Sequence, residues 1–364
     1  MLEKALNFIR EINEHGYDAY IVGGFVRDYV LGINSNDIDI STNATPKEII
    51  SIFEESCLPT EDYGSVTVIK YNIRFEITTF REEINYINNR KPAKIKYIDD
   101  LEKDLLRRDF TINSLCMGSD GKIIDLLHAM NDINKKVIRT IGDADRRFGE
   151  DCLRMLRAIR FATVLDFSLD DNVVAAIVNN KSLLKGLSYE RKKEELDKIF
   201  SSNNYKRGIE LLINLGLDKE LELDNLSKAV VADNLIGIWS ILNVVDKYPF
   251  SSNERELIRD INISMKIDNL DPYNLYTYGL YINSIAGQIK GIDKKDITEV
   301  YNALTIHKRS DLDITSEEIL ELLNIKPSKY LSEIYDDLVH NVIYKHINND
   351  NKALKDYILK KYSL

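Results

Sequence analysis

Two adjacent glycines open the first segment that could bind an anion. Gly23 and Gly24 directly follow the apolar run at residues 18–22, and Arg27 stands just beyond them. Backbone amides of a glycine turn can approach a phosphate closely, and the start of a helix favours negative charge. The turn therefore predicts a phosphate cradle to which Arg27 adds charge. A tight structural turn with an exposed arginine is the alternative.

Two aspartates at alternate positions form the second candidate site. Asp37 and Asp39 lie in the alternating segment 36–42, which is typical of a strand. Residues two apart in a strand face the same side, so the two carboxylates repel each other unless a cation lies between them. Mg²⁺ prefers such oxygen ligands together with substrate phosphates. A solvent-facing edge strand with two acids is the alternative.

The glycine turn and the aspartate pair together predict a site for a nucleoside triphosphate with Mg²⁺. Two metal ions could activate a hydroxyl there and stabilise the departing pyrophosphate. Such a site would include a third carboxylate on an adjacent strand. Glu76 is the best candidate, and an outward-facing strand acid is the alternative.

An arginine pair flanked by acids forms the third candidate site. Arg107 and Arg108 lie between Asp104 and Asp109, and Asn113 follows. A guanidinium held by a carboxylate can be aimed at a phosphate or a ribose. The alternative is the solvated, charged start of a helix.

A row of arginines after an aspartate forms the fourth candidate site. Asp151 and Arg154 are three residues apart, which predicts that they share one face of a continuous helix. Arg157 and Arg160 follow at the same interval. An exposed salt bridge on a solvated face is the alternative. The lack of acids between Asp151 and Asp166 argues against it, because an exposed face normally mixes signs.

Strands interleaved with helices must position the first of these groups. Strand patterns occupy residues 18–24, 36–42 and 65–80. The longest pattern predicts two strands joined by a turn near Tyr71 and Asn72. Residues 45–55 predict a helix with Thr45 as its N-cap. This alternation indicates an α/β domain over about residues 1–138, and the pattern is helical nearly throughout from about residue 143.

Composition sets the outer limits of the interpretation. The chain has 364 residues, a net charge of −10 and three cysteines. Two or three domains are expected, with reduced thiols, no disulfide framework and no zinc site. No apolar run approaches the ~18 residues of a membrane span. The acidic total argues at first against nucleic acid, but residues 141–210 sum to +1 and gather the arginines of the fourth site.

Five motifs in order give the chain a specific resemblance. It resembles the class II tRNA nucleotidyltransferases, the bacterial CCA-adding enzymes, which share a family with poly(A) polymerases in the polymerase β superfamily. The matching segments lie between about residues 20 and 200; residues 220–364 show no resemblance. The segments are GGFVRDYVLG, DIDIST, TTFREEINYINNRKPAKIKYIDDLEKDLLRRDFTIN, GEDCLRMLRAIRFA and YERKKEELDKIF.

The resemblance implies an α+β fold in three parts. A nucleotidyltransferase head would span residues 1–138, a helical neck that recognises the base 139–205, and a helical body and tail that bind tRNA 206–364. A cytoplasmic enzyme is implied, with tRNA, ATP and CTP as partners, Mg²⁺ as cofactor, and neither membrane nor DNA as a partner.

The resemblance also implies roles for individual residues. Asp37 and Asp39 would be catalytic and hold Mg²⁺, with Glu76 as the candidate third carboxylate. Asp151 and Arg154 would recognise the base. The remaining residues of the nucleotide site would be Gly23, Gly24, Arg27, Arg108, Asp109, Asn113, Arg157 and Arg160.

An aspartate–arginine pair can select two of the four bases without a template. Cytosine and adenine each present an exocyclic amine beside a ring nitrogen acceptor, whereas uracil and guanine present a carbonyl in place of the amine. Asp151 would accept from the amine and Arg154 would donate to the ring nitrogen. A carbonyl facing Asp151 would leave the carboxylate unpaired.

The subtype within the family has alternatives. Relatives that add only CC lack a flexible loop that is present here at residues 82–103, including Arg90, Lys91 and Pro92. Residues 251–364 sum to −3, unlike the basic extension usual in poly(A) polymerases, and the five histidines form no phosphohydrolase dyad. Full CCA addition is the function expected, although A-adding enzymes retain the loop as well and are not separated by it. The alternatives are an A-adding enzyme, a poly(A) polymerase and, more remotely, a non-catalytic RNA-binding protein.

Overall fold

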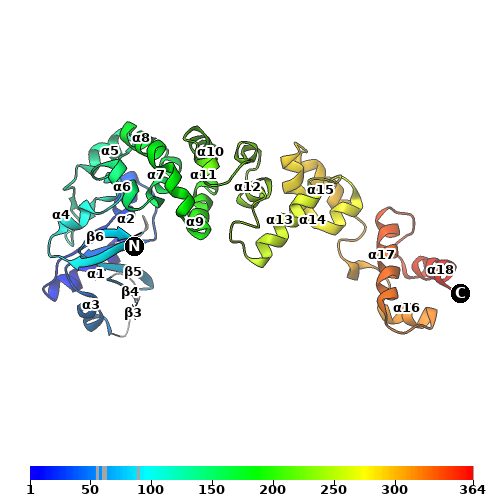
Figure 1. The fold of residues 1–364 in the computed structure, drawn as a ribbon. Coiled ribbons are helices and arrows are strands. Elements are labelled where there is room, and N and C mark those ends of the chain that lie inside the picture. Colours follow the sequence, from blue (N-terminus) through cyan, green and yellow to red (C-terminus); the bar gives the residue numbers. More distant parts are fainter. Residues whose placement is uncertain (55–56, 60–63, 88–90, 364) are drawn as a thin grey trace. The chain divides into compact units, whose positions relative to one another are not determined.

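A mixed β-sheet organises the N-terminal part of the chain. The computed structural model describes residues 1–54, 57–59, 64–87 and 91–363 (Figure 1). In this described part, the main sheet has the strand order β3-β4-β5-β2-β1-β8-β9. Its strands are β1 (Ala19–Val22), β2 (Ile38–Thr42), β3 (Cys57–Pro59), β4 (Ser65–Lys70), β5 (Ile73–Thr79), β8 (Cys116–Met117) and β9 (Ile123–Ile124).

The central strand β2 fixes the position of Asp39. It pairs antiparallel with β1 and parallel with β5, and the second pairing sets Asp39 opposite Glu76. Ile38 and Ile40 are buried, whereas Asp39 is exposed. Because side chains alternate along a strand, both carboxylates lie on the open face of the sheet.

The predicted hairpin within residues 65–80 is confirmed. β4 and β5 are joined by Tyr71 and Asn72, which have φ values of 56° and 60°. Positive φ at both central residues is the geometry of a two-residue hairpin turn whose twist matches that of its strands.

Helices cover the buried face of the sheet. Phe8 of α1 stacks on Phe75 of β5 at 4.1 Å and on Phe53 at 4.7 Å. The predicted helix at 45–55 forms α3, where Thr45 and Glu48 make a capping box. The remaining elements of the head are α1 (Leu2–Glu14), α2 (Gly24–Leu31), α3 (Pro46–Ile52), the hairpin β6 (Arg81–Ile87) and β7 (Lys91–Tyr97), α4 (Leu101–Leu106), η2 (Thr111–Asn113) and α5 (Ala129–Lys135).

The prediction of a continuous helix through Asp151 is wrong. The structure has two helices there, α6 (Ala144–Glu150) and α7 (Leu153–Val164). Asp151 is extended, with φ −140° and ψ 104°, and its Oδ1 accepts a hydrogen bond from the amide of Leu153 at 3.1 Å. Cys152 is the N-cap of α7, and the Asp151 carboxylate binds the first amide of this helix, a local bond that competes with a continuous helix through this residue.

Further helices pack against α7. They are α8 (Asp171–Asn180), η3 (Lys181–Gly186), α9 (Tyr189–Phe200), α10 (Tyr205–Asn214) and α11 (Leu217–Glu220), and the short strands β10 (Val137–Ile138) and β11 (Ser168–Leu169) pair in parallel. Gly208 lets α10 approach closely, because a Cβ there would lie 2.5 Å from Ile199 and 2.8 Å from Thr163. The loop between α9 and α10 is held near α7 by this contact.

Residues 1–223 and 224–364 form two compact units. The second contains η4 (Leu226–Val231), α12 (Leu235–Leu242), α13 (Ser252–Ser264), α14 (Pro272–Ile289), α15 (Lys294–Asn302), η5 (Arg309–Asp311), α16 (Ser316–Leu323), α17 (Lys329–Ile343) and α18 (Asn351–Tyr362). The three-part division at residues 138 and 205 stays a prediction. Among the described residues, no helix combines the length and apolarity needed to cross a membrane.

Candidate nucleotide site

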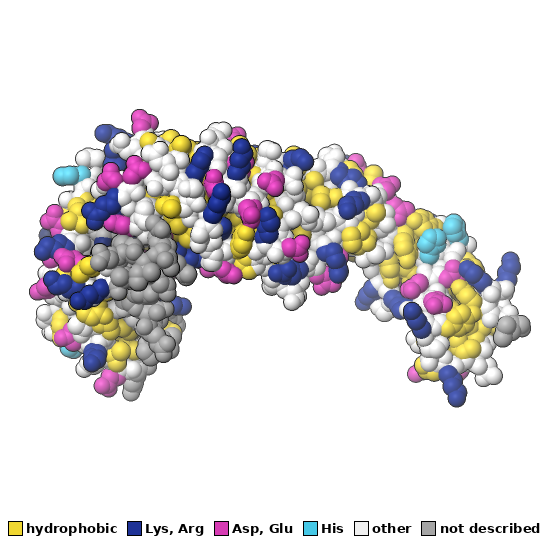
Figure 2. All heavy atoms as spheres, in the orientation of Figure 1, with side chains coloured by type: hydrophobic (Ala, Val, Ile, Leu, Met, Phe, Trp, Pro, Cys, Tyr) yellow, Lys and Arg dark blue, Asp and Glu magenta, His cyan; other side chains and the backbone are white. Residues whose placement is uncertain are grey.

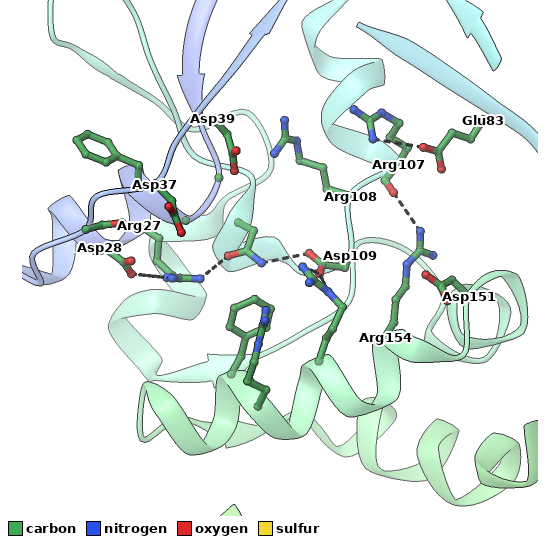
Figure 3. Close-up of a pocket in the computed structure, with 18 of the residues that line it drawn as sticks. Arg27, Asp28, Asp37, Asp39, Glu83, Arg107, Arg108, Asp109, Asp151 and Arg154 are labelled. Atoms are coloured by element: carbon green, nitrogen blue, oxygen red, sulfur yellow. Dashed lines mark hydrogen bonds and ion pairs between the residues drawn. The ribbon is translucent and has the colours of Figure 1, made fainter. Parts of the chain in front are cut away.

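One cavity collects nearly all of the predicted site residues. It has a volume of about 580 Å³, lies within the first unit, and is lined by residues of the head, by Asp151 and by residues of α7 (Figure 3). Of the predicted residues, Glu76 alone does not line it. Its predicted lining residues are Gly23, Gly24, Arg27, Asp37, Asp39, Arg108, Asp109, Asn113, Asp151, Arg154, Arg157 and Arg160.

The glycine turn lies directly against the charged groups of the cavity. Gly23 has φ 72°, a conformation that glycine adopts without strain, and α2 begins at Gly24. A Cβ at Gly23 would lie 3.3 Å from Nη1 of Arg108 and 3.6 Å from Oδ2 of Asp39. The lack of a side chain therefore keeps this part of the cavity open for a ligand.

The aspartate pair has the properties of a cation site in which a bound substrate completes the coordination of the metal. Within the described residues, neither Asp37 nor Asp39 takes part in an ion pair. The Asp39 side chain is accessible in the cavity, yet the surrounding protein partly desolvates its carboxylate and so raises its pKa; Arg108 opposes that shift, and the charges of Glu76 and Asp37 add to it. No group of three metal-binding side chains occurs among the described residues. Two carboxylates fit Mg²⁺, which commonly takes one or two from the protein and completes its shell with phosphates and water.

Glu76 lies beside the pair rather than in the cavity. It is opposite Asp39 across the parallel pairing of β2 and β5, on the same face of the sheet. Its carboxylate is exposed and forms an ion pair with Arg74 at 3.1 Å. A catalytic role for Glu76 thus stays a prediction, and the structure gives the acid a surface partner instead.

A buried aspartate holds the arginine pair. Asp104 is fully buried and contacts Nη2 of Arg107 at 2.7 Å and Nη2 of Arg108 at 3.5 Å. The guanidinium of Arg108 also donates to Oγ of Ser41 at 2.9 Å, and the amide of Arg81 donates to Asp104 at 3.2 Å. The predicted carboxylate-held guanidinium is therefore present, with Asp104 as the carboxylate.

Three further charged residues support this pair and were not predicted. Glu83 contacts Arg107 at 3.4 Å, and Arg147 donates to the backbone carbonyls of Arg107 and Arg108. Glu150 in turn holds Arg147 at 2.6 Å. Their spacing in the sequence gave no signal, because they come from β6 and α6 and meet only in the fold.

Replacing Asp104 with alanine is expected to lower the free energy of unfolding by about 3 kcal/mol, because two largely buried guanidiniums would lose a fully buried carboxylate partner, and Glu83 would still contact Arg107. Urea unfolding followed by circular dichroism measures the effect. Glu102→Ala, an exposed acid on the same helix, is the control and should change stability by less than about 0.5 kcal/mol. Equal stability of the two variants would contradict the support role of Asp104.

A chain of polar contacts crosses the cavity from α2 to α7. Nη1 of Arg27 donates to Oδ1 of Asn113 at 2.6 Å, and Nδ2 of Asn113 donates to Asp109 at 3.1 Å. Arg157 contacts the other oxygen of Asp109 at 2.6 Å. Burial alone would raise the pKa of Asp109, but Arg157 and Asn113 bring it well below its usual range. The carboxylate therefore stays ionised and fixed.

The pair predicted to recognise the base, Asp151 and Arg154, comes from the junction of α6 and α7. Arg154 is 7% exposed, and its guanidinium contacts Oε2 of Glu150 and the carbonyl of Arg147 at 3.3 and 3.1 Å. Arg191 of α9 lies 3.4 Å from Oδ2 of Asp151. Both side chains are thus fixed by neighbours and line the same end of the cavity (Figure 3).

Phe161 is a cavity residue that the sequence interpretation missed. The guanidinium carbons of Arg27, Arg157 and Arg160 lie 5.2, 5.4 and 4.4 Å from the centre of its ring. An aromatic face attracts cations, so one ring helps to hold three like charges together. Arg157 and Phe161 are four residues apart on α7, a spacing that could have indicated their contact.

Comparisons with known proteins identify the family. Residues 19–139 match the model described as "Poly A polymerase head domain", residues 166–225 "Probable RNA and SrmB- binding site of polymerase A", and residues 240–358 tRNA nucleotidyltransferase domain 2. The CCA-adding enzyme of Ligilactobacillus salivarius (strain UCC118) is 32% identical over 388 residues, spanning 97% of this chain and 95% of that protein. The chain belongs to the family of CCA-adding enzymes.

Solved structures of CCA-adding enzymes share the fold. The Bacillus stearothermophilus CCA-adding enzyme in complex with CTP superposes with a TM-score of 0.86 and 26% identity, over 98% of this chain and 96% of that one. The Thermotoga maritima CCA-adding enzyme complexed with tRNA_CCA gives a TM-score of 0.71 at 21% identity, over 99% and 94%. The resemblance predicted from five motifs is confirmed, and it extends over residues 220–364, where no motif was found.

Proposed function

We propose that the protein adds CMP, CMP and AMP to the 3′ end of tRNA without a template, using CTP and ATP and releasing pyrophosphate. One observation carries this function: a single cavity holds both the aspartate pair and the Asp151–Arg154 pair. Membership of the CCA-adding enzymes over the whole chain supports it. So does the CTP bound by the solved Bacillus stearothermophilus relative.

The reaction joins two groups that the cavity can hold together. The 3′ hydroxyl of tRNA attacks the α-phosphate of the nucleotide, a new P–O bond forms, and the bond to pyrophosphate breaks as the hydroxyl loses its proton. We assign Mg²⁺ to Asp37 and Asp39, where it would supply charge neutralisation and activation of the hydroxyl. The glycine turn at Gly23 and the guanidinium of Arg27 would bind the phosphates.

The far end of the cavity would select the base. Asp151 would accept a hydrogen bond from the exocyclic amine of cytosine or adenine, and Arg154 would donate to the neighbouring ring nitrogen. Because contacts from Glu150 and Arg191 already fix these two side chains, little conformational entropy is lost when a base binds.

Incubating the purified protein with tRNA that lacks CCA tests the function. The tRNA is supplied with labelled CTP alone, ATP alone, or both, and the products are separated at single-nucleotide resolution. We expect two CMP residues with CTP alone, and two CMP followed by one AMP with both nucleotides. A tRNA ending in CC is the matched control and should take one AMP.

Each other product pattern assigns a different subtype. Addition of AMP only to the tRNA that already ends in CC would indicate an A-adding enzyme, and long homopolymeric tails would indicate a poly(A) polymerase. No incorporation together with no binding of CTP by calorimetry would leave an RNA-binding protein that keeps the nucleotidyltransferase fold.

A further inference from the structure

A second cavity adjoins the nucleotide cavity and has no part in the reaction described above. It has a volume of about 630 Å³ and shares Arg27, Arg160 and Phe161 with the first. Its other walls come from the end of α7 and from the end of α9 with the loop that follows it. The described residues that line only this cavity are Val164, Leu165, Lys198, Ser201, Ser202, Asn203 and Asn204.

The charges of this cavity favour an anion. In a chain with a net charge of −10, none of the described residues lining this cavity is acidic and three are cationic. Arg27 is paired with Asp28 at 2.7 Å, and Arg160 with Glu195 at 3.3 Å. Lys198, by contrast, has no ion pair or hydrogen bond within the described residues, so its charge is available to a ligand.

The remaining walls favour a ligand larger than an inorganic anion. Val164 is 49% exposed at the end of α7, and Leu165 and Phe161 continue the apolar surface. Hydroxyl and amide groups of Ser201 and Asn203 are exposed beside it. Such a mixture suits a nucleotide unit, with a phosphate near Lys198 and a sugar or base over the apolar floor. Pyrophosphate could pair with the positive charges but would make no contact with the apolar surface.

The position of the cavity points to the RNA strand. A 3′ end that reacts in the first cavity must be preceded by nucleotides that lie close by, and this cavity is separated from the first by only three shared side chains. The segment matched by the RNA-binding family model, residues 166–225, includes Lys198 and the loop at 201–204.

We propose that the second cavity binds the tRNA strand immediately upstream of the reacting 3′ end, with Lys198 at a backbone phosphate and Val164 under a sugar or base. This assignment rests on the proposed function and adds a subsite to it.

Lys198→Glu and Val164→Asp test the subsite without altering the nucleotide cavity. We expect each variant to weaken the binding of tRNA lacking CCA by about tenfold at low salt, and Lys198→Glu to reduce the salt dependence of binding by about one phosphate contact. The Kd for CTP with Mg²⁺ should stay within about twofold of the unchanged protein, because neither residue lines the first cavity. Fluorescence anisotropy of labelled tRNA and calorimetry of CTP measure the two affinities.

Lys206→Glu is the matched control, since this exposed lysine of α10 makes the same change in charge outside the cavity. Loss of tRNA affinity as large in this control as in Lys198→Glu would overturn the subsite in favour of a general surface effect. Unchanged tRNA binding in both cavity variants would also overturn it. If the cavity variants bound tRNA normally but were inhibited less by pyrophosphate, the cavity would be a pyrophosphate site instead. Failure of the unchanged protein to extend tRNA would instead reject the proposed function.

Discussion

Replacing Asp39 with alanine is expected to abolish nucleotide incorporation while the protein stays folded. Asp39 lies on the open face of the central strand β2, beside Gly23 and opposite Glu76. Without this carboxylate, Mg²⁺ would lose one of its two protein ligands, and the charge stabilisation that metals supply in phosphoryl transfer is worth several kcal/mol. A fall in kcat of at least about 10³-fold is therefore expected.

The fold should tolerate this change because Asp39 stabilises little. It is exposed, it takes part in no ion pair among the described residues, and the alternation that buries Ile38 and Ile40 does not depend on it. Removing one of several mutually repelling carboxylates should leave the melting temperature unchanged or slightly higher. Differential scanning fluorimetry and gel filtration measure the fold.

Single-turnover incorporation of CMP into tRNA measures the activity of Asp39→Ala and Asp37→Ala. Glu102→Ala is a control for loss of an exposed acid outside the cavity and should retain full activity. Glu76→Ala separates the two interpretations of that residue: a comparable loss of activity would make it a third catalytic carboxylate, and full activity a surface acid. Wild-type rates in Asp39→Ala would contradict the metal assignment.

The sequence predicts well those features that depend on neighbours in the chain. Alternating side chains predict β2 and the β4–β5 hairpin, and the turn at Tyr71 and Asn72 is where the pattern places it. The glycine turn and the aspartate pair are likewise local, because each occupies a few consecutive residues. Their meeting in one cavity follows from the order of strands in the sheet.

Features that depend on distant residues are not predictable in this way. Asp104 is close to Arg107 and Arg108 in the sequence, so their contact was expected, but the full burial of its carboxylate depends on distant residues and was not. Glu83 and Arg147 complete that group from two other elements. Charge patterns along the chain do not indicate which charges the fold will bury together.

The helix break at Asp151 shows a different limit. Residues 143–165 have a continuous helical pattern, and no proline or strong breaker marks position 151. The break arises because a side-chain oxygen competes with the helix for the amide of Leu153. The sequence interpretation thus identified two residues that line the cavity but predicted the wrong local structure around Asp151.

The position of Asp151 at this break underlies the second large effect, a loss of base selection in Asp151→Asn. In uracil, a carbonyl replaces the amine of cytosine, so the carboxylate of Asp151 faces a second acceptor and gains no hydrogen bond from the base. Asparagine keeps an oxygen for the amide of Leu153 and gains an NH₂ group that can donate to that carbonyl. The ratio of kcat/KM for CTP over UTP is therefore expected to fall at least about tenfold.

Arg154 limits how far the selection can relax. Its guanidinium donates to the ring nitrogen of cytosine, whereas uracil presents an N–H there, so a second mismatch persists in Asp151→Asn. Asp151→Ala supplies neither acceptor nor donor and should lose CTP and ATP use alike, by about 10²-fold, without gaining UTP use. Single-nucleotide incorporation with each of the four triphosphates measures these ratios, and Asp145→Asn, an exposed change on α6, is the control. If Asp151→Asn kept the selectivity of the unchanged protein, a residue other than Asp151 would have to read the exocyclic group, because the amide replaces an acceptor facing the base with the donor that uracil requires and also removes the charge paired with Arg191.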